Sequence, residues 1–493
     1  MTTLHPLVQY FNKPSKDFTK QDLLRYIKEK HVEMINFRYV AGDGRLKTLN
    51  FVLHNENYTN EILSCGERVD GSSLFRNIDA GASDLYVIPR YSTTYINPFS
   101  EISTLDVLCS FYDKDGNPFQ NDPAMVMRRA ANVFKDKTGF EFECMGELEY
   151  YVIGKKDDLF YTEDQRGYHE SSPFTKFEQF RKEAMRMMTS CGCLIKYGHS
   201  EVGNFTLNDY VYEQNEIEFL PTAMIDAADQ LVLAKWILRT LAVKYNVSVT
   251  FSPKITVGKA GSGMHIHTRL MKDGKNVMLE NGKLSDTAKK AIAGYLDIAP
   301  SLSAFGNTNP MSYFRLVPHQ EAPTNICWGD RNRSALVRVP LGWDISKNMA
   351  VDANPAEPQK DAIYDNKQTV EFRSPDGSAN IYLLVAGLCV AARHGLEMQN
   401  ALEYARERYI SVNIFAEENK GIEYKQLPAS CDEAADCLEK QRTAYEKYDV
   451  FSPALIDATL DSLRSYYDKH LRKEVENRPQ ELLRLVEFYL HCG

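Results

Sequence analysis

The chain has 493 residues, of which 43% are hydrophobic and 25% are charged, and its net charge at pH 7 is -9. This composition predicts a globular protein of about two or three domains, and the lack of a long basic block argues against nucleic acid as its main partner. No apolar run is long enough to cross a membrane, the first residues lack a secretory signal pattern, and none of the ten cysteines forms a C-x-x-C pair, so we expect a cytoplasmic protein without a zinc cluster or disulfide framework.

The first part of the chain resembles a small α+β unit. Its expected elements are a helix at 20–30 and strands at 34–39, 47–53, 85–88 and 103–111, with a glycine-containing turn at 41–44. A hydrophilic turn then leads to Asp122-Pro123, a typical start of a helix, here predicted for 123–137. We therefore predict domains at 1–121 and 122–493. Hydrophobic period and length predict further helices at 226–245 and 383–409.

The second domain opens with an apolar stretch, 145–153, that carries Glu147 and Glu149. As a strand it would point both carboxylates to one face, where each raises the pKa of the other unless a cation lies between them. A divalent metal would neutralise the pair. For an isolated E-x-E, however, a solvated face of an antiparallel sheet is the better interpretation, so the rest of the chain must supply further ligands.

Further acidic and imidazole groups follow in apolar segments. They are His199 and Glu201, Glu216 and Glu218, His265 and His267, and Glu371. Carboxylates with an occasional imidazole suit Mg²⁺ or Mn²⁺ rather than a softer metal. Each segment alone is a weak signal, because a lone histidine on a strand is more often a hydrogen-bonded structural residue than a ligand.

Arginines supply the opposite charge. Arg315, Arg333, Arg338 and Arg373 lie in segments that we expect to be apolar strands, the first of them after a turn at Asn309-Pro310. Such arginines bind phosphate or carboxylate with two parallel hydrogen bonds. The sequence therefore predicts a metal-bound phosphate ligand, and it contains neither a P-loop nor a Rossmann glycine motif.

Taken together, these motifs resemble glutamine synthetase of the bacterial type I class over nearly the whole chain. The order in that family is D-G-S-S, E-x-E, H-x-E, Q-x-E, G-S-G-M-H-x-H, R-L-V-P-x-x-E-A-P, N-R-S-A-x-x-R-x-P and E-x-R-x-P-D. In this chain the motifs begin at Asp70, Glu147, His199, Gln214, Gly261, Arg315, Asn332 and Glu371. The resemblance implies a small β-grasp-like N-terminal domain and a larger catalytic domain, whose antiparallel sheet forms a funnel-shaped site flanked by helices.

The resemblance also implies roles for individual residues. Two metals, Mg²⁺ or Mn²⁺, would be held by one set of ligands consisting of Glu149, Glu201 and Glu216, and by a second consisting of Glu147, His265 and Glu371. ATP would lie near His267, Arg333 and Arg338, and glutamate near Gly261, Arg315, Arg333 and Arg373. Asp70 would bind ammonium and take its proton, and Glu321, on a flap, would bind substrate and close the site.

The implied reaction is the ATP-dependent synthesis of glutamine. The γ-carboxylate of glutamate would attack ATP to form an acyl phosphate, from which ammonia displaces phosphate. A γ-glutamyl ligase using a larger amine is the alternative, motivated by Ala260 and Arg269, where the family often has Asn and Ser, and by the insertions at 204–212 and 341–367. Lys367 is a candidate for the family's nucleotide-contacting lysine. A non-enzymatic relative is disfavoured, because a structural protein has no reason to bury like charges.

The same resemblance predicts assembly and bears on regulation. Asp70 lies in the first domain and the metal ligands in the second, which in the family reflects sites built between neighbouring subunits of two stacked six-membered rings. The family's adenylylation motif is Tyr-Asp-Leu-Pro. Here Tyr424 is displaced by one residue from the corresponding Leu-Pro, which argues against that modification.

Overall fold

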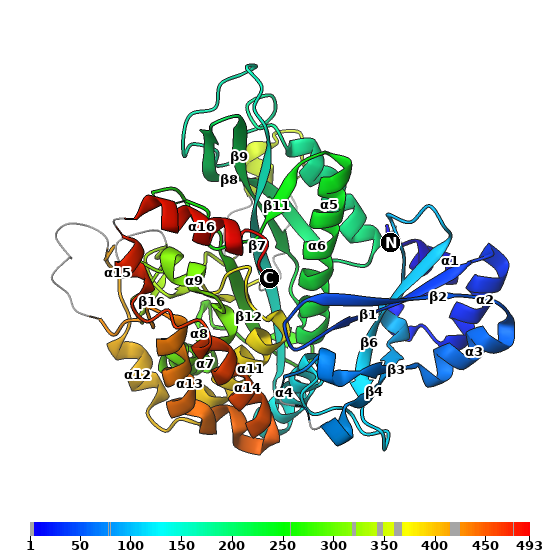
Figure 1. The fold of residues 1–493 in the computed structure, drawn as a ribbon. Helices are drawn as coiled ribbons and strands as arrows, with labels where there is room; N and C mark the ends of the chain where they lie inside the picture. Colours follow the sequence, from blue (N-terminus) through cyan, green and yellow to red (C-terminus); the bar gives the residue numbers. More distant parts are fainter. Residues whose placement is uncertain are drawn as a thin grey trace.

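The computed structural model describes residues 4–76, 78, 80–256, 258–317, 322–342, 349–358, 367–414, 424–476 and 478–493. A small domain built on one sheet lies at the side of a larger domain built on a second sheet and many helices (Figure 1). The predicted α+β class, with its small N-terminal domain and larger second domain, is confirmed. The boundary predicted at 121/122 falls between the last strand of the small sheet and the helix that follows.

The small sheet has the strand order β2-β1-β6-β4-β3, with β1 parallel to β6, the other pairs antiparallel, and β5 paired with β6. Its strands are β1 (Met34–Val40), β2 (Leu46–Val52), β3 (Glu67–Asp70), β4 (Asp84–Pro89), β5 (Tyr95–Ile96) and β6 (Thr104–Tyr112). The helices of this domain are α1 (Pro6–Phe11), α2 (Lys20–Lys30) and α3 (Glu56–Cys65). A capping box between Thr19 and Asp22 starts α2 where the sequence predicted it, because each side chain satisfies a free N–H of the first turn.

In the described part of the chain, the large sheet contains ten strands. Its main order is β16-β17-β18-β12-β7-β9-β8, antiparallel except for β16 and β17, with β10 and β11 paired to β7 and β13 paired to β12. The strands are β7 (Glu141–Lys155), β8 (Ile195–Leu207), β9 (Tyr210–Phe219), β10 (Thr222–Ala223), β11 (Ser248–Thr250), β12 (Met264–Lys272), β13 (Lys275–Asn276), β16 (Trp328–Asp330), β17 (Val337–Val339) and β18 (Val370–Phe372). A separate hairpin pairs β14 (Leu279–Glu280) with β15 (Lys283–Leu284).

Helices α4, α5 and α6, whose bounds are given below, pack against β7 and β8 of this sheet. The close approach of α6 to β7 is allowed by Gly146, where a Cβ would lie 2.8 Å from the Leu231 side chain. The helices are α4 (Pro123–Thr138), α5 (Glu178–Ser190), α6 (Met224–Lys244), α7 (Asp286–Asp297), α8 (Ala299–Gly306), α9 (Pro310–Arg315), α10 (Met349–Ala353), α11 (Ile381–Glu397), α12 (Ala401–Glu407), α13 (Cys431–Glu446), α14 (Pro453–Arg464), α15 (Leu471–Val475) and α16 (Pro479–Tyr489).

Two sequence predictions about helices were wrong. The segment 383–409 is not one helix, because the backbone becomes extended at Met398 and α11 and α12 meet at an angle of 109°. The expected turn at Asn309-Pro310 instead starts α9, since the Asn309 side chain accepts the N–H of Met311. Within the described residues, no single helix has the length and apolar character to cross a membrane, and α11 and α12 reach that standard only as a bent pair.

A buried ion pair fastens the small domain to the large one. Arg90, just after β4, donates two hydrogen bonds of 2.8 and 2.9 Å to Asp229 of α6, which also accepts the hydroxyl of Tyr382 from α11. The Arg38 guanidinium of β1 lies 4.4 Å from the ring centre of Trp236. These contacts hold the small sheet against α6 and α11.

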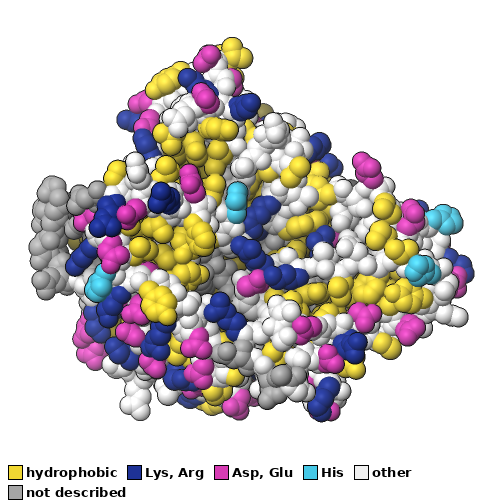
Figure 2. All heavy atoms as spheres, viewed as in Figure 1, with side chains coloured by type: hydrophobic (Ala, Val, Ile, Leu, Met, Phe, Trp, Pro, Cys, Tyr) yellow, Lys and Arg dark blue, Asp and Glu magenta, His cyan; other side chains and the backbone are white. Residues whose placement is uncertain are grey.

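The end of the chain also lies at this junction. Figure 2 shows Lys and Arg side chains gathered between the two domains, close to the C-terminus marked in Figure 1. Arg239 donates to the carbonyl oxygens of Cys492 and Gly493, and Arg45 of the small domain donates to that of His491. The final residues thus contact both domains.

Candidate active site

Strand pairing aligns acidic and imidazole side chains in two rows across the large sheet. In one row, His265 of β12 lies opposite Glu147 of β7. In the next row, Glu149 of β7 lies opposite Glu216 of β9, which lies opposite His199 of β8. Because the rows are two residues apart along β7, both project to the same face. The predicted E-x-E strand is therefore present, with both carboxylates on one side.

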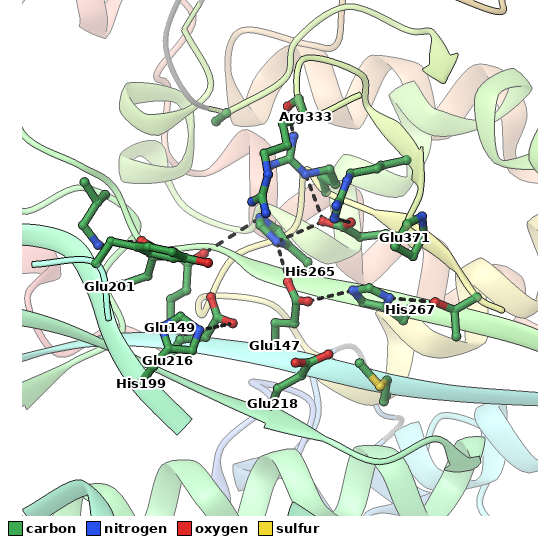
Figure 3. Close-up of a pocket in the computed structure, with 18 of the residues that line it drawn as sticks. Glu147, Glu149, His199, Glu201, Glu216, Glu218, His265, His267, Arg333 and Glu371 are labelled. Carbon is green, nitrogen blue, oxygen red and sulfur yellow. Dashed lines mark hydrogen bonds and ion pairs between the residues drawn. The ribbon is translucent and has the colours of Figure 1, made fainter. Parts of the chain in front are cut away.

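These rows line a cavity of about 1860 Å³. Most of the predicted site residues border it, namely Glu147, Glu149, Glu201, Glu216, Gly261, His265, His267, Arg315, Arg333, Arg338, Glu371 and Arg373. Figure 3 shows the labelled carboxylates and histidines pointing toward one another from β7, β8, β9, β12 and β18. Segments more than 200 residues apart in sequence thus form one site.

On the β12 side of the cavity, the carboxylates are matched by cations. Glu147 lies 2.9 Å from Nδ1 of His265 and 2.8 Å from Nε2 of His267, whose Nδ1 lies 2.9 Å from the Thr369 hydroxyl. Burial alone would raise the pKa of Glu147, but the two histidines hold that pKa well below its ordinary value. Burial likewise opposes charge on His267, yet Glu147 raises the pKa of this imidazole.

Glu371 has the same kind of surroundings. Its carboxylate accepts hydrogen bonds of 2.7 Å from Arg338 and 2.9 Å from Arg373, and one oxygen lies 3.4 Å from Nδ1 of His265. Although burial and the charge of Glu147 oppose ionisation, Arg373 and the histidines lower the pKa of Glu371. Glu371 is therefore a charged group in a buried, cation-rich environment.

On the β9 side, carboxylates crowd together. Burial, followed by the charges of Glu147, Glu149, Glu201 and Glu218, raises the pKa of Glu216 well above its ordinary value. Next along the strand, Glu218 accepts a 2.7 Å hydrogen bond from Lys196 on one oxygen, while its other oxygen is buried with no hydrogen-bond partner in the described part of the chain. Lys196 thus pairs with Glu218, whereas the charges that act on Glu216 are mainly those of other carboxylates.

Among the described residues, the donor atoms form three groups in which all ligand atoms lie within 4.8 Å of one another. The groups are Glu147 with His265 and Glu371, His199 with Glu201 and Glu216, and Glu147 with Glu218 and His267. Oxygen-rich sets with one imidazole and an unpaired carboxylate oxygen fit a divalent cation. The first group is the second predicted ligand set. Glu149, a member of the first predicted ligand set, belongs to none of these groups, and one of its oxygens accepts the N–H of Gly263 at 2.6 Å and the Gln214 amide at 3.2 Å.

The arginines border the cavity, but not all from strands as we expected. Arg315 ends helix α9, and its guanidinium donates to the carbonyl oxygens of Arg373, Ser374 and Pro375. Arg333 lies in the turn between β16 and β17, and its own carbonyl accepts the Arg373 guanidinium. Only Arg338 lies within a strand, β17. Apolar neighbours alone did not distinguish a strand from a helix end or a turn.

Of the predicted site residues that the structure describes, Asp70 does not border this cavity. Asp70 is the exposed last residue of β3, and hydrogen bonds from Ser72 and Ser73 lower its pKa. Glu321 lies outside the described residues. Among the positions that depart from the family, Arg269 borders the cavity and donates to Glu143 at 2.7 Å, and Lys367 also borders it.

Other segments singled out in the sequence have structural explanations. The insertion at 204–212 extends β8 and β9 into a longer hairpin, and part of the insertion at 341–367 lies outside the described residues. Tyr424 packs against the cluster of Cys327, Ala335, Ile410 and Ile414.

Sequence reasoning did not assign roles to several residues that the geometry adds. Glu218, Tyr197 and Lys196 border the cavity, and Thr369 contacts His267. For His199, the available signal was its period-two spacing from Glu201, which puts both on one face of a strand. The register that sets His199 opposite Glu216 is a property of strand pairing and has no local signature.

Comparison with known proteins agrees with this geometry. The glutamine synthetase catalytic domain model matches residues 120–478, and the glutamine synthetase beta-Grasp domain model matches residues 31–114. The chain is 28% identical to glutamine synthetase of Aquifex aeolicus over 92% of this chain and 96% of the relative. It is 31% identical to that of Pyrococcus horikoshii over 91% of this chain and 94% of the relative.

A solved structure shows the same fold. The cryo-electron microscopy structure of Plasmodium falciparum glutamine synthetase is similar with a TM-score of 0.75 at 20% sequence identity, covering 92% of this chain and 97% of that one. At this identity the likeness concerns the fold alone.

Proposed function

The chain belongs to the glutamine synthetase family and is a ligase that forms a C–N bond, and on this basis we propose that it joins ammonia to the γ-carboxylate of L-glutamate, with ATP converted to ADP and phosphate. The observation that carries the proposal is the convergence of three carboxylate and imidazole groups with Arg333, Arg338 and Arg373 around one cavity. Such a combination of metal ligands and guanidinium groups matches the charge of a transferring phosphoryl group.

We place two divalent cations, Mg²⁺ or Mn²⁺, on these ligands. Bound metal would supply charge neutralisation for the phosphate oxygens of ATP. Of the chain's own groups, Glu147 and Glu371 have lowered pKa values, so they are carboxylates suited to act as ligands. The hydrogen bond of His267 with Thr369 fixes the orientation of this ring at the ATP end.

The guanidinium groups would orient the substrates. We propose that Arg315 and Arg373 meet the carboxylates of glutamate near Gly261, and that Arg333 and Arg338 face the phosphoryl group. A γ-carboxylate held in line with ATP would give γ-glutamyl phosphate, and attack by ammonia would release phosphate. Glu321 would close the site against water, which otherwise hydrolyses the acyl phosphate.

Asp70 would bind ammonium and accept its proton, and we propose that a neighbouring subunit supplies it. The cavity is bordered by described residues from Met145 onward, with no described residue of the small domain among them. The family forms oligomers, and we propose two stacked six-membered rings with sites between neighbouring chains, since head-to-tail contacts close into a ring.

The reaction is tested by measuring phosphate release and product mass with ATP, glutamate and a panel of amines, with and without Mg²⁺ or Mn²⁺. Glutamine formed from ammonium supports the proposal. Product formed only with an alkylamine or polyamine would establish the alternative γ-glutamyl ligase. No ligation with any amine would contradict both.

The shared site is tested by mixing Asp70→Ala with Glu371→Ala chains, each expected to be inactive alone. Random co-assembly should restore about a quarter of the sites, because a site with both intact residues then forms between chains. A matched mixture of Asp70→Ala with Asp84→Ala, an exposed carboxylate of the same domain, shows the activity contributed by chains with an intact Asp70. Mixed assemblies with no activity above the two inactive parents would exclude the shared site.

A further inference from the structure

The His199 ring lies beside two carboxylates in a position that suits a metal ligand. It lies on β8 directly opposite Glu216 of β9, and its Nε2 is 3.3 Å from a Glu216 oxygen. One ring nitrogen of His199 and one oxygen each of Glu201 and Glu216 lie within 4.8 Å of one another. The ring is largely buried, with 13% of its side chain exposed.

A second observation fixes the tautomer of this ring. Nδ1 of His199 lies 3.0 Å from the carbonyl oxygen of Ser200. Because a carbonyl oxygen can only accept, Nδ1 must carry the hydrogen, so that in the neutral ring the lone pair lies on Nε2, the nitrogen nearest Glu216. Histidines that bind metals commonly donate their other N–H to a carbonyl or carboxylate in this way.

Meanwhile Glu149, the residue that the family resemblance places here, is partly engaged elsewhere. One of its oxygens accepts the N–H of Gly263 and the Gln214 amide, and the other lies 3.9 Å from Nε2 of His265. Its carboxylate is therefore directed toward β12, whereas His199 approaches Glu216 from the opposite neighbouring strand.

We propose that Nε2 of His199 is a ligand of the divalent cation bound by Glu201 and Glu216. The proposal deepens the proposed function, on which it rests for the presence of that cation. Each of the two principal sites then contains one imidazole, His199 in one and His265 in the other. Since imidazole suits transition metals and Mg²⁺ prefers oxygen, this ligand favours Mn²⁺ over Mg²⁺ at the Glu216 site.

The test uses full-length protein without ATP, glutamate or amine, so that its outcome is independent of the ligase reaction. Mn²⁺ binding is followed through the EPR signal of the free ion, and imidazoles per bound Mn²⁺ are counted by X-ray absorption. We expect His199→Gln to lower the imidazole count and to weaken one class of Mn²⁺ sites by roughly tenfold or more, with a smaller effect on Mg²⁺.

His169→Gln is the matched control, because this exposed ring lies 4.4 Å from the His199 ring and belongs to none of the described ligand groups. It should keep the wild-type count and affinity. His265→Gln gives the count expected when one known candidate ligand is lost.

An unchanged imidazole count and unchanged Mn²⁺ affinity in His199→Gln would overturn the proposal. If that variant does not fold, His199→Asp decides the question, because a carboxylate can replace the ligand. We expect His199→Asp to bind metal with a reduced imidazole count and a shift of preference toward Mg²⁺. A wild-type count in folded His199→Asp would equally refute the assignment.

Discussion

Glu371 and Glu216 are buried carboxylates on the same sheet, yet their neighbours carry opposite charges. Glu371 accepts hydrogen bonds from Arg338 and Arg373, whereas Glu216 lies among Glu147, Glu149, Glu201 and Glu218. The pKa of Glu371 is accordingly lowered, and that of Glu216 is raised by burial and by like charge. Arginines of the protein balance the charge of Glu371, whereas the like charges around Glu216 are of the kind that a bound cation would neutralise.

Removing the metal should have the largest effect. In excess chelator we expect ligation to fall by roughly a thousandfold or more, because the loss of several kcal/mol of charge stabilisation acts directly on the transition state. The melting temperature should fall as well, since an ion that binds only the folded protein stabilises it. Turnover that persists in chelator, with metal content verified, would contradict the dependence of this site on metal.

A substitution can remove the charge balance around Glu371. Glu371→Gln removes the carboxylate that pairs with the buried Arg373 and the partly buried Arg338, and we expect the metal-free protein to lose about 3 kcal/mol or more of unfolding free energy. Urea denaturation measures this change. Glu403→Gln, which removes an exposed partner of Arg406, should cost well under about 1 kcal/mol. Equal effects of the two changes would show that Glu371 is not a buried, paired charge.

The matching substitution at Glu216 should change the unfolding free energy in the opposite direction. Glu216→Gln removes one of several like charges at nearly constant volume, and we expect it to stabilise the metal-free protein by about 1 kcal/mol while it weakens metal binding. The matched control is Glu213→Gln on the same strand. Glu213 accepts the N–H groups of Lys176 and Phe177, so its substitution should destabilise. Destabilisation of metal-free protein by Glu216→Gln would mean that its charge is already compensated.

The smallest expected effect is on the pH dependence of the unfolding free energy, to which Glu216 should contribute with the opposite sign from Glu147 and Glu371. Because the folded-state pKa of Glu216 is raised, its contribution to stability is present at low pH and is lost as the pH rises. Glu147 and Glu371 have lowered pKa values, so their contributions are present at neutral pH and are lost on acidification. The advantage of metal-free Glu216→Gln over wild type should therefore shrink from pH 8 to pH 5. Urea midpoints that differ by a constant amount would refute this.

Much of the site was predictable because it depends on local periodicity. A period of two sets Glu147 beside Glu149 and His265 beside His267, and the structure has both pairs on strands. The position of His199 opposite Glu216 arises from strand register, which no local pattern specifies. The break at Met398 carries no proline, and the nearby Gly395 lies inside α11 rather than at the break. Arg315 ends a helix, although its apolar neighbours favoured a strand.

The buried contact between Arg90 and Asp229, which also binds the Tyr382 hydroxyl, bears on how ATP use is coupled to product formation. It fastens the small domain to α6 and α11, while no described residue of that domain borders the cavity. Under the proposed function, an isolated chain would retain the groups that activate glutamate and lack the group that prepares its acceptor. A dissociated chain could then use ATP to form γ-glutamyl phosphate, which water would hydrolyse before an amine reacts with it. Subunit contacts would therefore affect the amount of product formed per ATP as well as the rate of the reaction.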